Sequence, residues 1–137
     1  TPFHQDFAYA EEMSAGSSLS RATRHVAVWL ALTPTGPRSG CMRFAPSLGY
    51  ELQPHQTLPR AEAPSGFETH MIGHSVERAE AAAEDAVLEP GMAVIIGDQV
   101  VHGSYGGKRA ESDRLAFSPL FEVDCVECPL PAGRRRC

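Results

Sequence analysis

Short apolar segments separated by turn residues are the feature that most restricts the fold of this chain. Residues 25–32 read HVAVWLAL, residues 93–96 read AVII, and residues 41–45 and 114–123 form two further runs. Valine, isoleucine and aromatic residues favour extended strands, and prolines or glycines lie close to the ends of these runs. This spacing is typical of an all-β sandwich or barrel, so we predict a mainly β fold with few helices.

The size and charge of the chain limit its function classes. Its 137 residues, 42% of them hydrophobic, predict one globular domain that spans residues 1–137. Seventeen acidic against 12 basic side chains give a net charge of −5, which argues against nucleic acid as a partner. No apolar run approaches the ~18 residues of a membrane span. The four cysteines do not form a disulfide pattern, so we expect reduced thiols and a cytoplasmic location.

Two regions lie outside this strand pattern. Residues 53–89 are polar and contain several prolines, and their stretch 75–86 is rich enough in alanine and glutamate for one short helix. A long polar segment between strands is more often a lid or binding loop than core, so we interpret 53–89 as an insertion. Residues 124–137 contain an isolated CxxC and are predicted to form a tail.

Two histidines and one carboxylate are the candidate metal ligands. His4-Gln5-Asp6 is an H-x-D motif, whose first and third side chains point to one face of a strand. His102 follows an apolar strand and precedes a glycine turn. Two histidines and a carboxylate form the facial triad of non-haem Fe(II) oxygenases. Arg114, at the start of the last strand, can grip a carboxylate with two hydrogen bonds.

In sequence order, these segments resemble the phytanoyl-CoA dioxygenase family of Fe(II)/2-oxoglutarate-dependent oxygenases. The segments that carry the resemblance are HQD with Tyr9, HVAVWLAL at 25–32, SGCMRFAP at 39–46, GMAVIIGD at 91–98, HGS at 102–104 and RLAF at 114–117. Two family features differ: the P-G-S-H turn reads PSLGY at 46–50, and a glycine stands where an asparagine often follows the H-G-S turn. Neither departure touches the histidines, the aspartate or the arginine.

The resemblance implies a double-stranded β-helix, the jelly-roll fold that cupins share. It implies that His4, Asp6 and His102 bind Fe(II) as the catalytic centre. Arg114 and Ser104 would hold the distal carboxylate of 2-oxoglutarate, and Trp29 would line the co-substrate pocket. The implied reaction hydroxylates a small organic substrate and releases succinate and carbon dioxide. An intact aspartate favours hydroxylation, because related halogenases carry a small residue there.

The resemblance also implies a longer protein. Family members carry a long segment before the H-x-D motif, which supplies supporting helices and the first strands. We therefore expect residues 1–137 to be the C-terminal part of one domain without the usual N-terminal helical part. A preceding segment, or a second copy in a homo-oligomer, would complete the barrel.

Two other functions remain open from the sequence. One is a truncated jelly-roll that binds a metal or ligand without turnover. The other is a cupin-type metalloenzyme that uses the same three ligands without 2-oxoglutarate. The presence of Arg114 favours the oxygenase over the cupin-type enzyme, because a cupin does not need an arginine twelve residues after the second histidine.

Overall fold

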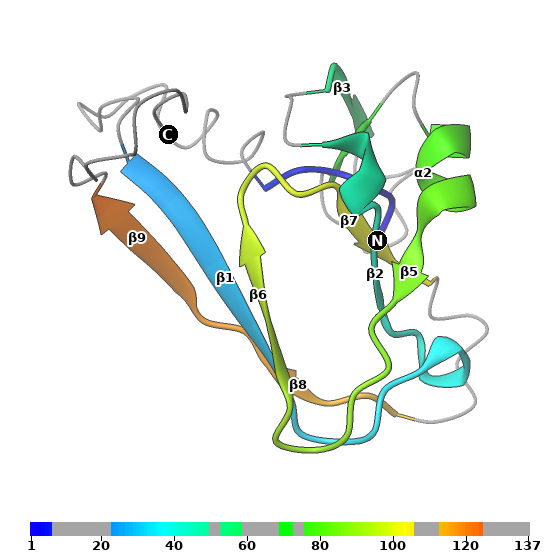
Figure 1. Ribbon diagram of the computed structural model, residues 1–137, viewed down its shortest axis with the longest axis vertical. Helices are drawn as coiled ribbons and strands as arrows, with labels where there is room; N and C mark the ends of the chain where they lie inside the picture. Colours follow the sequence, from blue (N-terminus) through cyan, green and yellow to red (C-terminus); the bar gives the residue numbers. More distant parts are fainter. Residues whose placement is uncertain (7–22, 50–52, 59–68, 73–75, 106–112, 125–137) are drawn as a thin grey trace, which may run out of the picture.

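A computed structural model describes residues 1–6, 23–49, 53–58, 69–72, 76–105 and 113–124 (Figure 1). Tyr9 and the CxxC of the predicted tail lie outside these residues. The strands are β1 (Thr23–Ala31), β2 (Met42–Phe44), β3 (His55–Leu58), β4 (Thr69–Ile72), β5 (Glu84–Asp85), β6 (Ala93–Gly97), β7 (His102–Ser104), β8 (Ala116–Phe117) and β9 (Leu120–Asp124). The helices are α2 (Val76–Ala82) and two short 3-10 helices, η1 (Pro37–Ser39) and η2 (Pro46–Leu48). The fold is mainly β, as predicted.

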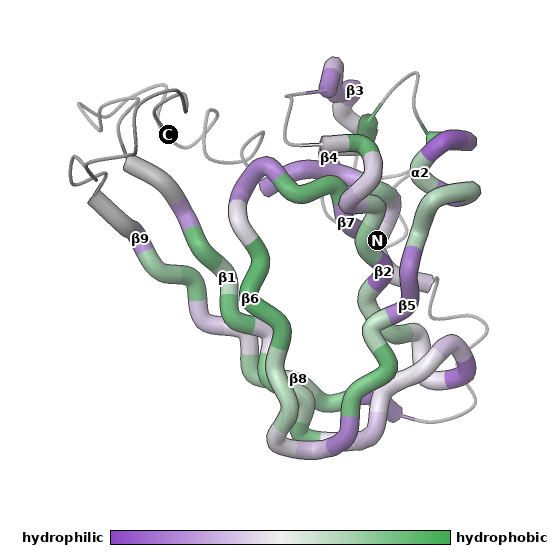
Figure 2. The backbone as a smooth tube through the Cα atoms, viewed as in Figure 1, coloured by the Kyte–Doolittle hydropathy of each residue, from purple (hydrophilic) through white to green (hydrophobic). Residues whose placement is uncertain are grey.

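The apolar segment at 25–32 forms β1, which organises the largest sheet. β1 pairs antiparallel with β6 along one edge, and with β8 and β9 along the other. Figure 2 shows apolar residues along β6 and along the part of β1 beside it. Ala27, Trp29 and Ala31 alternate along β1 and are buried together with Ile96 of β6. We call this four-stranded sheet the β1 sheet; its inner face is the one that carries Trp29.

A smaller sheet lies across the core from the β1 sheet. β2 is its centre and pairs antiparallel with β5 and β7, and we call it the β2 sheet. Met42 and Phe44 of β2 pack against the buried cluster around Trp29. The chain passes from one sheet to the other between β6 and β7 (Figure 1). This crossing carries His102 from the end of the apolar strand to the β2 sheet.

The last predicted strand, 114–123, is two strands in the structure. β8 and β9 both pair with β1, and residues 118 and 119 separate them. The break occurs at Pro119, whose ring nitrogen has no hydrogen to donate to a ladder. Its carbonyl oxygen still accepts a hydrogen bond of 3.0 Å from the backbone of Val28, so the edge of β1 stays covered.

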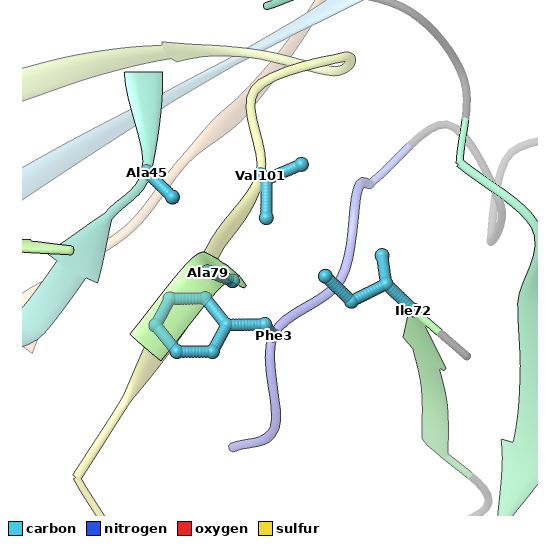
Figure 3. Close-up of a cluster of buried hydrophobic side chains, with 5 residues drawn as sticks. All are labelled: Phe3, Ala45, Ile72, Ala79 and Val101. Atoms are coloured by element: carbon cyan, nitrogen blue, oxygen red, sulfur yellow. The ribbon is translucent and has the colours of Figure 1, made fainter. Parts of the chain in front are cut away.

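A second core lies under the N-terminal segment. Phe3, Ala45, Ile72, Ala79 and Val101 are buried together, and Figure 3 shows the Phe3 ring beside Ala79 of α2. The backbone NH of Ile72 in β4 donates to the carbonyl of Phe3 at 2.9 Å. Part of the predicted 53–89 insertion therefore packs on the N-terminal segment. Among the described residues, no helix is long and apolar enough to span a bilayer.

Candidate functional site

The N-terminal segment carries the H-x-D motif and lies against β7. The backbone NH of His4 donates to the carbonyl of His102 at 2.8 Å, and the NH of His102 donates back at 2.9 Å. Gly103 makes this approach possible, because a Cβ there would lie 3.1–3.2 Å from the backbone of Thr1, Pro2 and Phe3. The glycine of the H-G-S turn thus allows the two ligand-bearing segments to pair directly.

The side chains of His4, Asp6 and His102 converge at this pairing. His4 Nε2 lies 3.4 Å from Asp6 Oδ1, and His102 Nε2 lies 3.5 Å from the same oxygen. One ligand atom from each residue falls within 4.8 Å of the other two. His4 and His102 are buried, and Asp6 is partly exposed. The structure therefore brings together the three residues predicted from the sequence as metal ligands.

Backbone carbonyls fix the orientation of both histidine rings. His4 Nδ1 lies 2.8 Å from the carbonyl oxygen of Pro2, and His102 Nδ1 lies 2.8 Å from that of Val100. A carbonyl oxygen only accepts, so each Nδ1 carries the hydrogen and each Nε2 keeps its lone pair. Metal-bound histidines are commonly held in this way. The ring of Phe44 also stacks on His102, with centroids 6.1 Å apart.

The charges at the site favour a cation. Burial alone would raise the pKa of Asp6, but the interaction with the His4 side chain and the nearby rings of His102, His4 and His25 bring that pKa below its usual value. Burial, followed by the influence of His4, lowers the pKa of His102. Asp6 is thus ionised and His102 neutral near neutral pH, which are the forms that bind a metal.

The donor set fits a divalent first-row metal. Ligands about 2.1 Å from one octahedral ion, at right angles to each other, stand about 3 Å apart. The two distances to Asp6 exceed this by about half an ångström or less, and the ligand atoms of His4 and His102 lie within 4.8 Å of each other, so side-chain movement can close the set. Two imidazoles and one carboxylate on one side of the ion suit non-haem iron.

Gln5 is a supporting residue that the sequence analysis did not identify. Its side chain is fully buried. The Oε1 atom accepts from the backbone NH of Gln53 at 2.8 Å, and Nε2 donates to the carbonyl of Gln99 at 2.6 Å. The backbone NH of Gln5 donates to His55 Nε2 at 3.1 Å. Gln5 thus ties the H-x-D segment to β3 and to the chain before β7. Nothing local in the sequence signals these long-range bonds.

Of the three residues predicted to hold 2-oxoglutarate, Arg114 and Trp29 are in contact with each other. The Arg114 guanidinium stacks over the Trp29 ring, with Cζ 5.1 Å from the centroid, and donates to the carbonyl of Gly40. Within the described part of the chain, no carboxylate lies within ion-pair distance of Arg114. The Ser104 hydroxyl lies two residues beyond His102 and is 2.9 Å from the backbone nitrogen of Thr1.

Comparison with protein families gives one match. The family model described as phytanoyl-CoA dioxygenase (PhyH) matches residues 1–114, which include all six predicted site residues. The comparison with curated protein sequences gives no match.

Solved structures with a similar fold include two structures of EvdO2 and a non-haem monooxygenase. EvdO2 from Micromonospora carbonacea var. aurantiaca superposes with a TM-score of 0.66 at 22% identity, over 97% of this chain and 49% of EvdO2. A second EvdO2 structure, in complex with 2-oxoglutarate, gives 0.63 at 22% identity, over 96% and 49%. The non-haem monooxygenase ThoJ in its apo form gives 0.59 at 23% identity, over 90% and 39%.

These comparisons establish the fold and the family. The chain spans about half the length of EvdO2 and less than half that of ThoJ. The likeness to these structures confirms the double-stranded β-helix predicted from the sequence. Because the family model covers most of its residues, the chain belongs to the phytanoyl-CoA dioxygenase family.

Proposed function

We propose that this chain carries the catalytic centre of an Fe(II)/2-oxoglutarate-dependent oxygenase that hydroxylates a small organic substrate. The observation that carries the proposal is the convergence of His4, Asp6 and His102, with the Nδ1 atom of each histidine ring held by a backbone carbonyl. When bound, Fe(II) and 2-oxoglutarate supply oxygen activation, coupled to release of succinate and carbon dioxide. The chain's own residues bind, orient and shield these groups.

In this proposal, His4, Asp6 and His102 hold the iron through one face. The hydrogen bonds from Nδ1 keep both rings in the tautomer that binds a metal through Nε2. The two side chains therefore need little further ordering when the metal binds. The Asp6 carboxylate supplies the negative charge that offsets part of the charge of Fe(II). Because the third ligand is a carboxylate rather than a small residue, the proposal favours hydroxylation over halogenation.

Arg114 is the proposed anchor for the distal carboxylate of 2-oxoglutarate. It is a partly buried cation that, among the described residues, has no carboxylate within ion-pair distance. Arg114 Nη1 donates a hydrogen bond to the Gly40 carbonyl, and the other N–H groups of the planar guanidinium can bind an anion. The Trp29 ring beneath it limits its rotation, and the Ser104 hydroxyl offers a further hydrogen bond.

The test separates binding of the metal from binding of the co-substrate. Arg114→Ala and Arg114→Lys are titrated with Fe(II) and then with 2-oxoglutarate under anaerobic conditions. We expect nearly unchanged iron affinity in both variants and at least about tenfold weaker 2-oxoglutarate binding in Arg114→Ala, because a charged bidentate contact is lost. Equal losses for iron and 2-oxoglutarate would mean that Arg114 is structural and would contradict its proposed role.

A further inference from the structure

His25 is a polar residue on the inner face of the β1 sheet that the proposed function does not use. It lies two residues before Ala27 and four before Trp29, so it shares their side of β1. The backbone NH of Asp98, four residues before His102, donates to the carbonyl of His25 at 3.2 Å, and the His25 ring also contributes to lowering the pKa of Asp6. His25 therefore occupies the end of β1 nearest the proposed iron ligands.

One nitrogen of His25 is buried without a partner. Nδ1 has no hydrogen-bond partner, and it is the one such atom among the buried side chains of the described residues. Buried polar atoms in native proteins are nearly always paired, so an exception calls for an explanation. A ligand that completes the hydrogen bond is one physical explanation, and it fits the location at the end of β1 nearest the proposed iron ligands.

The other ring nitrogen determines what Nδ1 can bind. Nε2 lies 3.8 Å from Oε1 of Glu122, a residue of β9 that pairs with His25 across the sheet. A carboxylate beside Nε2 favours the tautomer that carries its hydrogen on Nε2. In that tautomer, Nδ1 is an acceptor and requires an O–H or N–H donor from its ligand.

Acidic groups around His25 restrict the chemical class of the ligand further. Asp98 Oδ2 lies 3.4 Å from the backbone nitrogen of His25, and Asp98 is buried. The Glu122 side chain is largely exposed, so the Nε2 side of the His25 ring borders solvent, whereas Nδ1 is buried. Asp98 and Glu122 thus place two carboxylates around His25, one at its backbone nitrogen and one at Nε2, and these repel an anion and attract a donor group, above all a cationic one.

We propose that His25 Nδ1 is a substrate-binding group that accepts a hydrogen bond from a hydroxyl or amino group of the substrate, with Asp98 and Glu122 excluding carboxylate and phosphate groups. This inference rests on the proposed function, because it names the substrate chemistry of the same site. It makes Ala27, the small residue between His25 and Trp29 on this face, part of the floor of the substrate space.

The test uses three probes with the same alkyl chain and different end groups: hexylamine, hexan-1-ol and hexanoate. They are titrated into metal-free, 15N-histidine-labelled protein, and the Nδ1 resonance of His25 is followed. We expect hexylamine and hexan-1-ol to shift this resonance and hexanoate to leave it unchanged. His25→Leu should weaken hexylamine binding about tenfold, the effect of one lost hydrogen bond. His25→Asn should restore much of it, because an amide oxygen can replace Nδ1 as acceptor.

Val28→Ala, on the opposite face of β1, is the matched control and should bind hexylamine like the wild type. An equal response to hexanoate, no response to any probe, or unchanged hexylamine binding in His25→Leu would overturn the proposal. Fe(II) titration of wild type and His25→Leu separates this result from the proposed function. Both should bind iron equally, whereas a wild type that binds no iron would contradict the proposed function and leave the probe result to decide on His25.

Discussion

The β1 sheet and the N-terminal segment are held in place by different forces. β1 has five residue pairs with β6 and five with β9, and its inner face is buried with apolar side chains. The N-terminal segment pairs with β7 through the His4–His102 bridge and through a hydrogen bond of 2.9 Å from the Ser104 NH to the Thr1 carbonyl. Otherwise it depends on the Gln5 side chain and on contacts of Phe3. The scaffold is thus a repeated backbone ladder, and the site is a small set of individual bonds.

This difference separates stability from metal binding. A substitution in the apolar core lowers the free energy of unfolding of such a sheet. The many backbone hydrogen bonds of its ladders still keep the strands in register. The three ligands at the site have no such redundancy, so a small shift of the N-terminal segment separates His4 and Asp6 from His102. We therefore expect substitutions in the β1 sheet to act mainly on stability, and substitutions around Gln5 to act also on metal affinity.

The largest expected effect is on the β1 sheet. Trp29→Ala should lower the free energy of unfolding by about 3–5 kcal/mol, because it empties the centre of the buried cluster. Urea denaturation measures this loss, and Fe(II) titration of the folded variant should give the wild-type affinity. A fall in iron affinity as large as that of the Gln5 variant would break the separation between the two regions.

The next effect is at the N-terminal segment. Gln5→Ala leaves the Gln53 NH and the Gln99 carbonyl without their partner, and should cost about 2–3 kcal/mol of stability. Iron affinity should also fall about 10–100-fold, as for other residues that orient metal ligands.

Thr35→Val is the matched control for Gln5→Ala. The buried Thr35 hydroxyl also joins two backbone groups, donating to the Ala86 carbonyl and accepting from the Leu88 NH. The variant should lose comparable stability in urea and keep its iron affinity. If both variants lost iron affinity to the same extent, iron binding would depend on overall stability and not on the position of Gln5.

The smallest effect compares two glycines. Gly103→Ala places a methyl group against the backbone of residues 1–3, and should cost about 1–2 kcal/mol and weaken iron binding about tenfold. Gly97→Ala in β6 meets no atom within 4 Å and should leave iron binding unchanged. Thermal unfolding and Fe(II) titration measure both; the reverse order of effects would contradict the close approach at β7.

The sequence was sufficient for the parts of the fold with a local signal. β1 and β6 follow from their β-branched and apolar residues, and α2 follows from its alanines and glutamates. His4, Asp6 and His102 followed from spacing, from the glycine turn and from the family resemblance. Their placement at one point confirms the geometry, while their role in binding iron stays a prediction.

Other features depend on contacts between distant segments. Gln5 bonds to Gln53 and Gln99, and no local pattern marks such a residue. The free Nδ1 of His25 follows from its packing, which the sequence does not encode in any short motif. The break between β8 and β9 had a local signal, Pro119, that the prediction of a single strand did not use.

The most direct test of the account is the visible spectrum of the anaerobic protein with Fe(II) and 2-oxoglutarate. The wild type should show a visible metal-to-ligand charge-transfer band, because the three ligands leave positions at which 2-oxoglutarate can chelate the iron. His102→Ala should lack the band and keep the circular dichroism of the β fold. A folded wild type without the band, or a band that persists in His102→Ala, would contradict the account.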